Sequence, residues 1–306
     1  MAEYRKYLDP EVLAKISRLE LRARVIVEGF ISGLHKSPYH GFSVEFAAHR
    51  EYVPGDDIRH IDWRLYGRGD RLYIKQYEEE TNLRTQVLLD CSRSMAYPEN
   101  ERAGWRNKYD YAATLAAAIM YLLMHQQDAC GLMLFDHAIR RQIPPTSRTA
   151  QLLSMIELIE ANQPDDTTDL KILLADLAGQ LRQRGLVVLI SDMLADIDAL
   201  TAGLQRLRHS GHDVIVLHVL DHDELAFPFR ENTLFDGLEQ PDRRVLADPQ
   251  ALRESYLEIV QRFISRIRSA CVDNRVDYCL LSTRDPLDAG LAAFLAARMR
   301  RGTRRW

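Results

Sequence analysis

Three side chains that follow an apolar run near residue 90 have the chemistry of cation ligands. The stretch "VLLDCSRSM" stops being apolar at Asp90, and Ser92 and Ser94 follow at alternate positions. Alternate residues leaving a strand can point the same way, and carboxylate and hydroxyl oxygens suit a hard divalent cation such as Mg²⁺. The same residues could instead form a turn that ends the strand, because Asp and Ser are common at strand ends and helix N-caps.

Further oxygen donors follow other apolar runs of the chain. Ser191 and Asp192 come directly after "VVLI", and Thr167 and Thr168 lie in "DDTTD", just before a predicted helix. In open parallel sheets, ligands bind beyond the carboxyl ends of the strands, so these loops can meet at one edge. If the loops converge, five side chains with oxygen donors line one site at this edge: Asp90, Ser92, Ser94, Thr168 and Asp192.

The elements that must position these residues alternate between strands and helices from residue 84 onward. Nearly all-apolar runs predict the main strands, and 3.6-residue periodicity predicts the helices between them. The predicted strands are 84–90, 129–136, 186–192, 213–220 and 276–283, with a short edge strand at 137–143 closed by Pro144 and Pro145. The predicted helices are 108–127, 148–162, 168–185, 196–211, 250–274 and 286–300. This alternation is typical of an α/β, Rossmann-like fold: an open, mostly parallel sheet with helices on both faces.

The first 80 residues have a different character and are predicted to form a small appendage. Residues 10–34 show helical periodicity, and residues 42–80 hold short alternating runs and Gly- and Pro-containing turns, with one strand at 71–77. We therefore predict two parts, an N-terminal helix and β-rich appendage at 1–80 and the α/β domain at 81–306. The α/β domain carries an irregular insertion at about 222–249.

Composition limits the classes of function. The 306 residues carry 40 Lys and Arg against 44 Asp and Glu, a formal net charge of −4, so bulk charge gives no reason to expect nucleic-acid binding. The four cysteines form no C-x-x-C pair, which argues against structural zinc or a disulfide framework. No stretch approaches the roughly 20 apolar residues of a membrane span, and the N-terminus lacks the apolar core of a signal peptide. A cytoplasmic protein without a membrane span is expected.

The usual signatures of catalysis do not occur in the sequence. It holds no G-x-S-x-G elbow, Walker A loop, G-x-G-x-x-G fingerprint or H-E-x-x-H motif. A strand-end aspartate beside Mg²⁺ could be a phosphoryl-transfer nucleophile, so a Mg²⁺-dependent phosphohydrolase using Asp90 is the alternative function. Phosphatases of the haloacid dehalogenase type need a second acid two residues later, where this chain has Ser92. The sequence favours a protein that is not an enzyme, and no small-molecule substrate is expected.

Two sets of motifs resemble known families. "LLDCSRSM", "DDTTDL" and "VLISDML" look like the three parts of the metal-ion-dependent adhesion site of von Willebrand factor A domains. Upstream, "EFAAHREYVPGDDIRHIDWRLYGRGDRLYIKQYEEET" resembles the signature of a bacterial family, domain-of-unknown-function family 58. The resemblance covers about residues 40–220 and implies a von Willebrand factor A-like fold.

Carried over position by position, the resemblance assigns ligands to a metal ion, Mg²⁺ or Mn²⁺. It implies Asp90, Ser92 and Ser94 as ligands from the first loop and Asp192 from the third. It implies Thr168 from the second loop, with Thr167 as the alternative.

The resemblance also implies a function. We expect a metal-dependent protein-interaction module whose Mg²⁺ binds a carboxylate of the partner. The family suggests a MoxR-type AAA+ ATPase as that partner, in a chaperone-like or maturation role. A third hypothesis keeps the fold with an empty site, as a scaffold that binds partners through residues 40–80.

Overall fold

The chain divides into two compact units, Ile31–Asn82 and the remainder. The computed structural model describes residues 49–51, 73–75, 84–98, 107–148, 150–165, 179–181, 183–237, 244–287, 290–292 and 294. In the smaller unit the described residues form two antiparallel strands, β1 (His49–Glu51) and β2 (Tyr73–Lys75). Strand β2 lies inside the strand predicted at 71–77, whereas the predicted helix at 10–34 lies outside the described residues.

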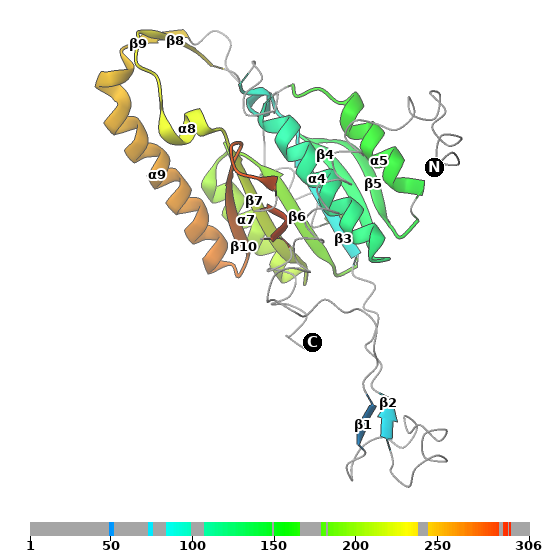
Figure 1. Ribbon diagram of the computed structural model, residues 1–306. Coiled ribbons are helices and arrows are strands. Elements are labelled where there is room, and N and C mark those ends of the chain that lie inside the picture. Colours follow the sequence, from blue (N-terminus) through cyan, green and yellow to red (C-terminus); the bar gives the residue numbers. More distant parts are fainter. Residues whose placement is uncertain are drawn as a thin grey trace, which may run out of the picture. The chain divides into compact units, whose positions relative to one another are not determined.

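A six-stranded sheet forms the centre of the larger unit (Figure 1). Its strand order is β10-β7-β6-β3-β4-β5, and every neighbouring pair is parallel except β4 and β5. The strands are β3 (Arg84–Asp90), β4 (Ala129–Phe135), β5 (Ile139–Thr146), β6 (Leu186–Ser191), β7 (Asp213–Leu220) and β10 (Asp277–Ser282). This architecture confirms the predicted fold class.

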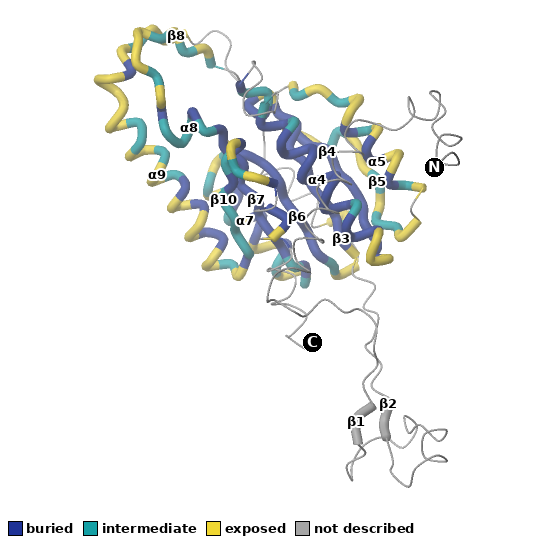
Figure 2. Tube along the Cα trace, viewed as in Figure 1, coloured by how far each residue is buried: buried dark blue, intermediate teal, exposed yellow. Residues whose placement is uncertain are grey.

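The four inner strands are buried along almost their whole length (Figure 2). Their sequences are nearly continuous apolar runs because helices cover both faces of a parallel sheet, so neither face can carry a solvated row of side chains. One polar exception stands out in β3, where the Gln86 side chain is only 2% exposed.

The edge strand β5 is longer than the sequence predicts. It continues through Pro144 and Pro145 to Thr146, whereas the two prolines were expected to close it. Proline cannot donate to a strand ladder, but an edge strand has one side without a neighbour and tolerates it. The pairing of β5 with β4 also shifts register between Cys130 and Leu132, which accommodates the irregular backbone.

Helices cover the sheet on both sides (Figure 1). On one side α7 (Ile197–His209) and α9 (Pro249–Asp273) pack against apolar side chains of the sheet, among them Leu88, Leu189 and Val216. On the other side lie α4 (Lys108–His125) and α5 (Ala150–Ala161). The predicted helices at 168–185 and 286–300 fall largely outside the described residues.

Helix α4 is buried nearly all round. Its sequence "KYDYAATLAAAIMYLLMH" is apolar on every side except near its ends, which is typical of a helix enclosed by protein. The Asn107 side chain caps it by accepting a hydrogen bond from the Asp110 N–H at 2.9 Å. The unusual feature is its first residue, because Lys108 is charged and 0% exposed.

The insertion is more regular than predicted. After β7 the chain forms a short helix, α8 (His222–Ala226), and a two-stranded antiparallel ribbon of β8 (Thr233–Asp236) and β9 (Arg244–Ala247). Aromatic packing stabilises the regular structure of the insertion. The ring of Phe227 stacks on Tyr256 of α9 and on Phe235 of the ribbon, at centroid distances of 4.3 and 5.8 Å.

The strand order locates the point where a ligand site can form. From β3 the chain first builds outward to β4 and β5, and then returns to the other side of β3 to add β6, β7 and β10. Connections therefore leave the carboxyl ends of β3 and β6 in opposite directions, and such a switch point leaves a crevice between the loops. The described helices include none that is long and apolar enough to cross a membrane.

Candidate functional site

The first predicted loop forms a tight turn at the end of β3. Asp90 is the last residue of the strand, and its Oδ1 accepts a hydrogen bond from the Ser92 N–H at 2.9 Å. Ser92 precedes a short 3₁₀ helix, η3 (Arg93–Ala96), and the Oγ atoms of Ser92 and Ser94 lie 3.1 Å apart. All three side chains are at most 2% exposed. The structure thus brings the three first-loop residues together.

The third predicted loop adjoins the first. The Ser191 hydroxyl, at the end of β6, donates to Asp90 Oδ2 at 2.5 Å and accepts from the Met193 N–H at 2.9 Å. Asp192 follows directly and is fully buried. The Ser94 side chain lies close enough to the Asp192 carboxylate to lower its pKa. Asp90, Ser92, Ser94 and Asp192 therefore lie close together at the carboxyl ends of β3 and β6.

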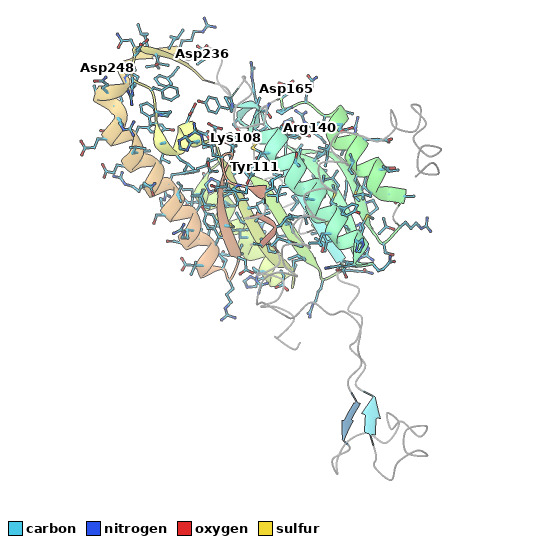
Figure 3. All side chains as sticks on the ribbon, in the orientation of Figure 1. Lys108, Tyr111, Arg140, Asp165, Asp236 and Asp248 are labelled. Atoms are coloured by element: carbon cyan, nitrogen blue, oxygen red, sulfur yellow. The ribbon has the colours of Figure 1, made fainter. Side chains whose placement is uncertain are left out.

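The second predicted loop lies outside the described residues, and with it Thr167 and Thr168. The chain just before it is described: the Asp165 N–H donates to Cys91 O at 3.0 Å, directly beside the first loop. Arg140 of β5 holds this segment, donating to Asp165 O at 2.7 Å and pairing with Asp136 at the end of β4 (Figure 3). The segment that leads into the predicted second loop is thus anchored at the site.

A buried lysine reaches the site from α4 (Figure 3). Lys108 Nζ lies 2.8 Å from Asp192 Oδ2 and 2.8 Å from Glu224 Oε1. Glu224 belongs to α8, and its side chain is 21% exposed, whereas those of Lys108 and Asp192 are fully buried. The lysine therefore connects the third loop to the insertion, and its ammonium group is the positive charge that balances Asp192.

The charges of the site shift its pKa values. Burial and the nearby charge of Asp192 raise the pKa of Asp90 to about 7, against the lowering effect of its hydrogen bonds to Ser191 and Ser92. Burial also opposes charge on Asp192, but the Lys108 ammonium outweighs it and lowers the pKa of that carboxyl. Burial would lower the pKa of Lys108, but Asp192 and Glu224 raise it overall. Lys108 thus favours the charged form of Asp192, whereas the charge of Asp192 and burial disfavour the charged form of Asp90.

A histidine fixes the backbone of the third loop. His218 of β7 lies with Nε2 2.9 Å from Asp192 O and Nδ1 2.8 Å from the Tyr278 hydroxyl. Because a carbonyl can only accept, Nε2 carries the proton and Nδ1 accepts from the tyrosine. Burial lowers the pKa of His218 to about 4, so the ring is neutral near pH 7.

The donor set fits a hard divalent cation. Among the described residues no cluster of three or more His, Cys, Asp or Glu side chains could hold a metal ion. The predicted set differs in kind, because it joins two carboxylates to two hydroxyl groups. Burial and the neighbouring charge of Asp192 raise the pKa of Asp90, and a divalent cation bound there would favour its charged form. Neutral hydroxyl ligands would leave such a cation with positive charge to spare.

Comparison with known proteins identifies the family. The family described as "Protein of unknown function DUF58" matches residues 48–263, about two thirds of the chain. The chain belongs to the DUF58 family. Relatives with 26% identity over 301 residues include uncharacterized proteins of Mycobacterium bovis and Mycobacterium tuberculosis, with 95% of this chain and 91% of the relative covered.

Solved structures similar to this DUF58 chain share little sequence with it. They include an aerotolerance-related membrane protein from Bacteroides fragilis, with 17% identity, a TM-score of 0.48, and 71% of this chain and 99% of that chain covered. The BatB protein from Bacteroides thetaiotaomicron has 15% identity, a TM-score of 0.43, and coverage of 72% and 99%. The VWA domain of SpRpn10 has 13% identity, a TM-score of 0.39, and coverage of 69% and 94%.

The sequence analysis does not identify Lys108 or Glu224 as residues of the site. It places Lys108 only on a helix and Glu224 only in an irregular insertion. Lys108 is 84 residues from Asp192 and 116 residues from Glu224 in the chain. One signal was present. A lysine in the first turn of an otherwise apolar helix is unfavourable for the helix dipole, so it needs a compensating carboxylate. Ser191 was considered as a strand-end donor but not chosen as a site residue.

Proposed function

We propose that this DUF58 protein is a metal-dependent protein-interaction module. Asp90, Ser92, Ser94 and Asp192 would hold Mg²⁺ or Mn²⁺, with Thr168, or Thr167 in its place, completing the set from the second loop. The observation that carries this proposal is the clustering of these four oxygen donors at the switch point of the sheet. A bound Mg²⁺ would offer a coordination position to a carboxylate from another protein.

Lys108 gives this site a feature of its own. Its ammonium already neutralises Asp192, so a divalent cation must share that carboxylate with a tethered positive charge. Among the described residues Asp90 forms no ion pair, and burial and the charge of Asp192 raise its pKa. We infer that Asp90 contributes most to metal affinity and that Lys108 lowers the affinity while keeping the site folded without metal.

A partner protein would reach the site from its partly exposed side. Glu224 is the member of this cluster that reaches solvent, and it belongs to α8 of the insertion. An acidic side chain from outside would therefore approach where Glu224 now meets Lys108. The family resemblance suggests a MoxR-type AAA+ ATPase as that partner in the cytoplasm, with a chaperone-like or maturation role.

A phosphohydrolase fits the contacts of Asp90 less well. Both of its carboxylate oxygens accept hydrogen bonds, from the Ser92 N–H and the Ser191 hydroxyl, and the side chain is fully buried. A nucleophile needs an oxygen directed at the substrate. His218, the neighbouring base candidate, has both ring nitrogens hydrogen bonded. We therefore infer a binding role, with no catalytic residue.

Isothermal titration calorimetry of the purified protein with MgCl₂ and MnCl₂ tests the metal site. The wild type should bind one divalent cation, and Asp90→Ala should bind none while keeping its far-UV circular dichroism spectrum. Asp198→Ala, an exposed acid in the first turn of α7, is the matched control and should bind like the wild type. Metal binding by Asp90→Ala equal to that of the wild type would falsify the assignment.

The interaction role needs a second measurement. The tagged protein is used to capture partners in MgCl₂ and in EDTA, with Asp90→Ala as background. Capture of an AAA+ ATPase that depends on both Mg²⁺ and Asp90 would support the proposal. Equal capture in EDTA would instead favour a scaffold that works without the metal.

A further inference from the structure

A pocket lies at the opposite end of the sheet, near the amino ends of β3 and β6. Its volume is about 230 Å³, and its lining includes four glutamines. These are Gln86, Gln142, Gln180 and Gln183. Among the described lining residues, Arg84 at the start of β3 is the one charged group, and none is acidic.

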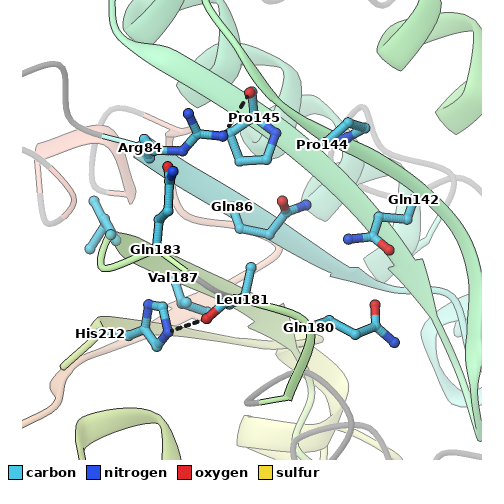
Figure 4. Close-up of a pocket in the computed structure, with 12 residues that line it drawn as sticks. Arg84, Gln86, Gln142, Pro144, Pro145, Gln180, Leu181, Gln183, Val187 and His212 are labelled. Carbon is cyan, nitrogen blue, oxygen red and sulfur yellow. Dashed lines mark hydrogen bonds between the residues drawn. The ribbon is translucent and has the colours of Figure 1, made fainter. Parts of the chain in front are cut away.

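The Gln86 amide is the unusual group in this pocket. Figure 4 shows it in the middle of the pocket, between the side chains of Arg84 and Gln142. The residue is 2% exposed, and neither its Oε1 nor its Nε2 has a hydrogen-bond partner among the described residues. A buried amide without partners costs free energy, so a glutamine here destabilises the fold unless something binds it.

The surrounding backbone leaves room for this amide. A Cβ atom added at Gly131 of β4 would lie 2.8 Å from Gln86 Oε1 and 2.6 Å from Ile143 O, so only glycine fits at this position. On the rim, Arg84 Nη2 donates to Pro145 O at 3.3 Å, and no other hydrogen bond of its guanidinium is present among the described residues. The pocket thus combines a buried donor and acceptor with an exposed cation whose other N–H groups can bind an anion.

We propose that this pocket binds the C-terminal end of a peptide chain. The terminal carboxylate would pair with Arg84, because a guanidinium binds a carboxylate in a bidentate fashion. Arg84 and Gln86 are alternate residues of one strand, about 6.6 Å apart, which is the span of about two extended peptide residues. A peptide group near the C-terminus would therefore meet the Gln86 amide, which can both donate to its carbonyl and accept from its N–H.

The other lining residues agree with this ligand. Pro144 and Pro145 offer rigid apolar walls, and Gln142, Gln180 and Gln183 are exposed at the rim, where they can bind further peptide groups. The absence of acidic groups from the described lining favours a ligand that is anionic or neutral. None of these residues belongs to the candidate metal site, so binding here needs no divalent cation.

Fluorescence polarisation tests this proposal on the full chain in EDTA. The probe is a mixture of N-fluoresceinyl hexapeptides with randomised residues and a free C-terminal carboxylate, and the comparison is the same mixture with a C-terminal carboxamide. The carboxylate mixture should bind saturably, and the carboxamide mixture about tenfold more weakly. Arg84→Met should remove this difference, whereas Arg266→Met, an exposed arginine of α9, should preserve it.

Gln86→Leu separates a binding role from a structural one. This variant should lose peptide binding about tenfold and yet raise the Tm by roughly 2–4 °C, because it removes a buried amide without partners. Gln205→Leu, at an exposed position of α7, is the control and should change neither property. Three results would overturn the proposal: no saturable binding of the carboxylate mixture, wild-type binding by Gln86→Leu, or N-acetylalanine binding as tightly as the hexapeptides.

Discussion

The two ends of strand β3 differ in the charge of their surroundings. At its carboxyl end, Asp90 shares a buried site with Asp192, and the Lys108 ammonium supplies the compensating charge. At its amino end, Gln86 lies in a pocket whose described lining includes three further glutamines and one charged residue, the exposed Arg84. Gln86 and Asp90 are four residues apart on the same face of one strand, since side chains alternate.

This difference separates two kinds of recognition on one sheet. The carboxyl end holds strong, mutually paired charges, so its stability and binding should depend on cations and on pH. The amino end holds a neutral amide that has no hydrogen-bond partner among the described residues, so the binding proposed there should need no divalent cation. The same strand order explains both, because the loops at the carboxyl ends of β3 and β6 diverge while their amino ends lie side by side.

Among the substitutions considered, Lys108→Met should change the free energy of unfolding most. Removing the ammonium leaves buried carboxylates without their counter-ion, so the free energy of unfolding in EDTA should fall by about 3–5 kcal/mol. Adding MgCl₂ should restore part of this loss, because a divalent cation can neutralise the same carboxylates. Urea denaturation in EDTA and in MgCl₂ measures both changes.

The matched control is an ion pair of the same kind at the surface. Arg262 pairs with Glu258 on α9, and both side chains are more than 60% exposed. Arg262→Met should change the free energy of unfolding by less than about 1 kcal/mol, with or without magnesium. Equal losses for the two variants would show that the buried cation at the carboxyl end has no special role.

His218→Gln should have a smaller effect: it should weaken the loss of stability that the protein shows as the pH falls. The folded pKa of His218 is about 4, below the ordinary value of 6.5, so the unfolded chain binds more protons between these values. The wild type should therefore lose about 2 kcal/mol through this group between pH 7 and pH 5. Glutamine can still donate to Asp192 O but does not titrate, so the variant should lose correspondingly less.

Urea denaturation in EDTA at both pH values measures this difference. His209→Gln, at an exposed position of α7, is the control and should follow the wild type. If His218→Gln shows the same pH dependence as the wild type, the histidine does not contribute to the pH sensitivity of the carboxyl end.

The sequence was sufficient for the fold and for part of the candidate site. The apolar run before Asp90 and the one before Asp192 predicted two strands of a parallel sheet, because strands buried on both faces need apolar residues throughout. The structure shows that these two strands are neighbours. Because Asp90 and Asp192 each lie at the carboxyl end of such a strand, they were expected to lie at the same edge of the sheet. Thr167 and Thr168 remain predictions, since they lie outside the described residues.

The contacts that set the charge of the site were beyond the sequence. The pairing of Lys108 with Glu224 depends on how α8 packs after β7, and local patterns do not encode that packing. Gln86 had a visible signal, a polar residue within an apolar strand, but its unpaired amide emerges only when β4 and β5 close around it. Pattern reasoning places residues on strands, whereas compensation of charge needs the tertiary structure.

Diffraction from crystals grown with MnCl₂ tests whether the loops at the carboxyl end of β3 hold a metal ion. We expect an anomalous peak between the first and third loops, with Asp90 and the hydroxyl oxygens of Ser92 and Ser94 at about 2.1 Å, and no such peak in crystals of Asp90→Ala. A crystal in which Lys108 still pairs with Asp192 and no manganese lies beside Asp90 at saturating MnCl₂ would contradict this metal site.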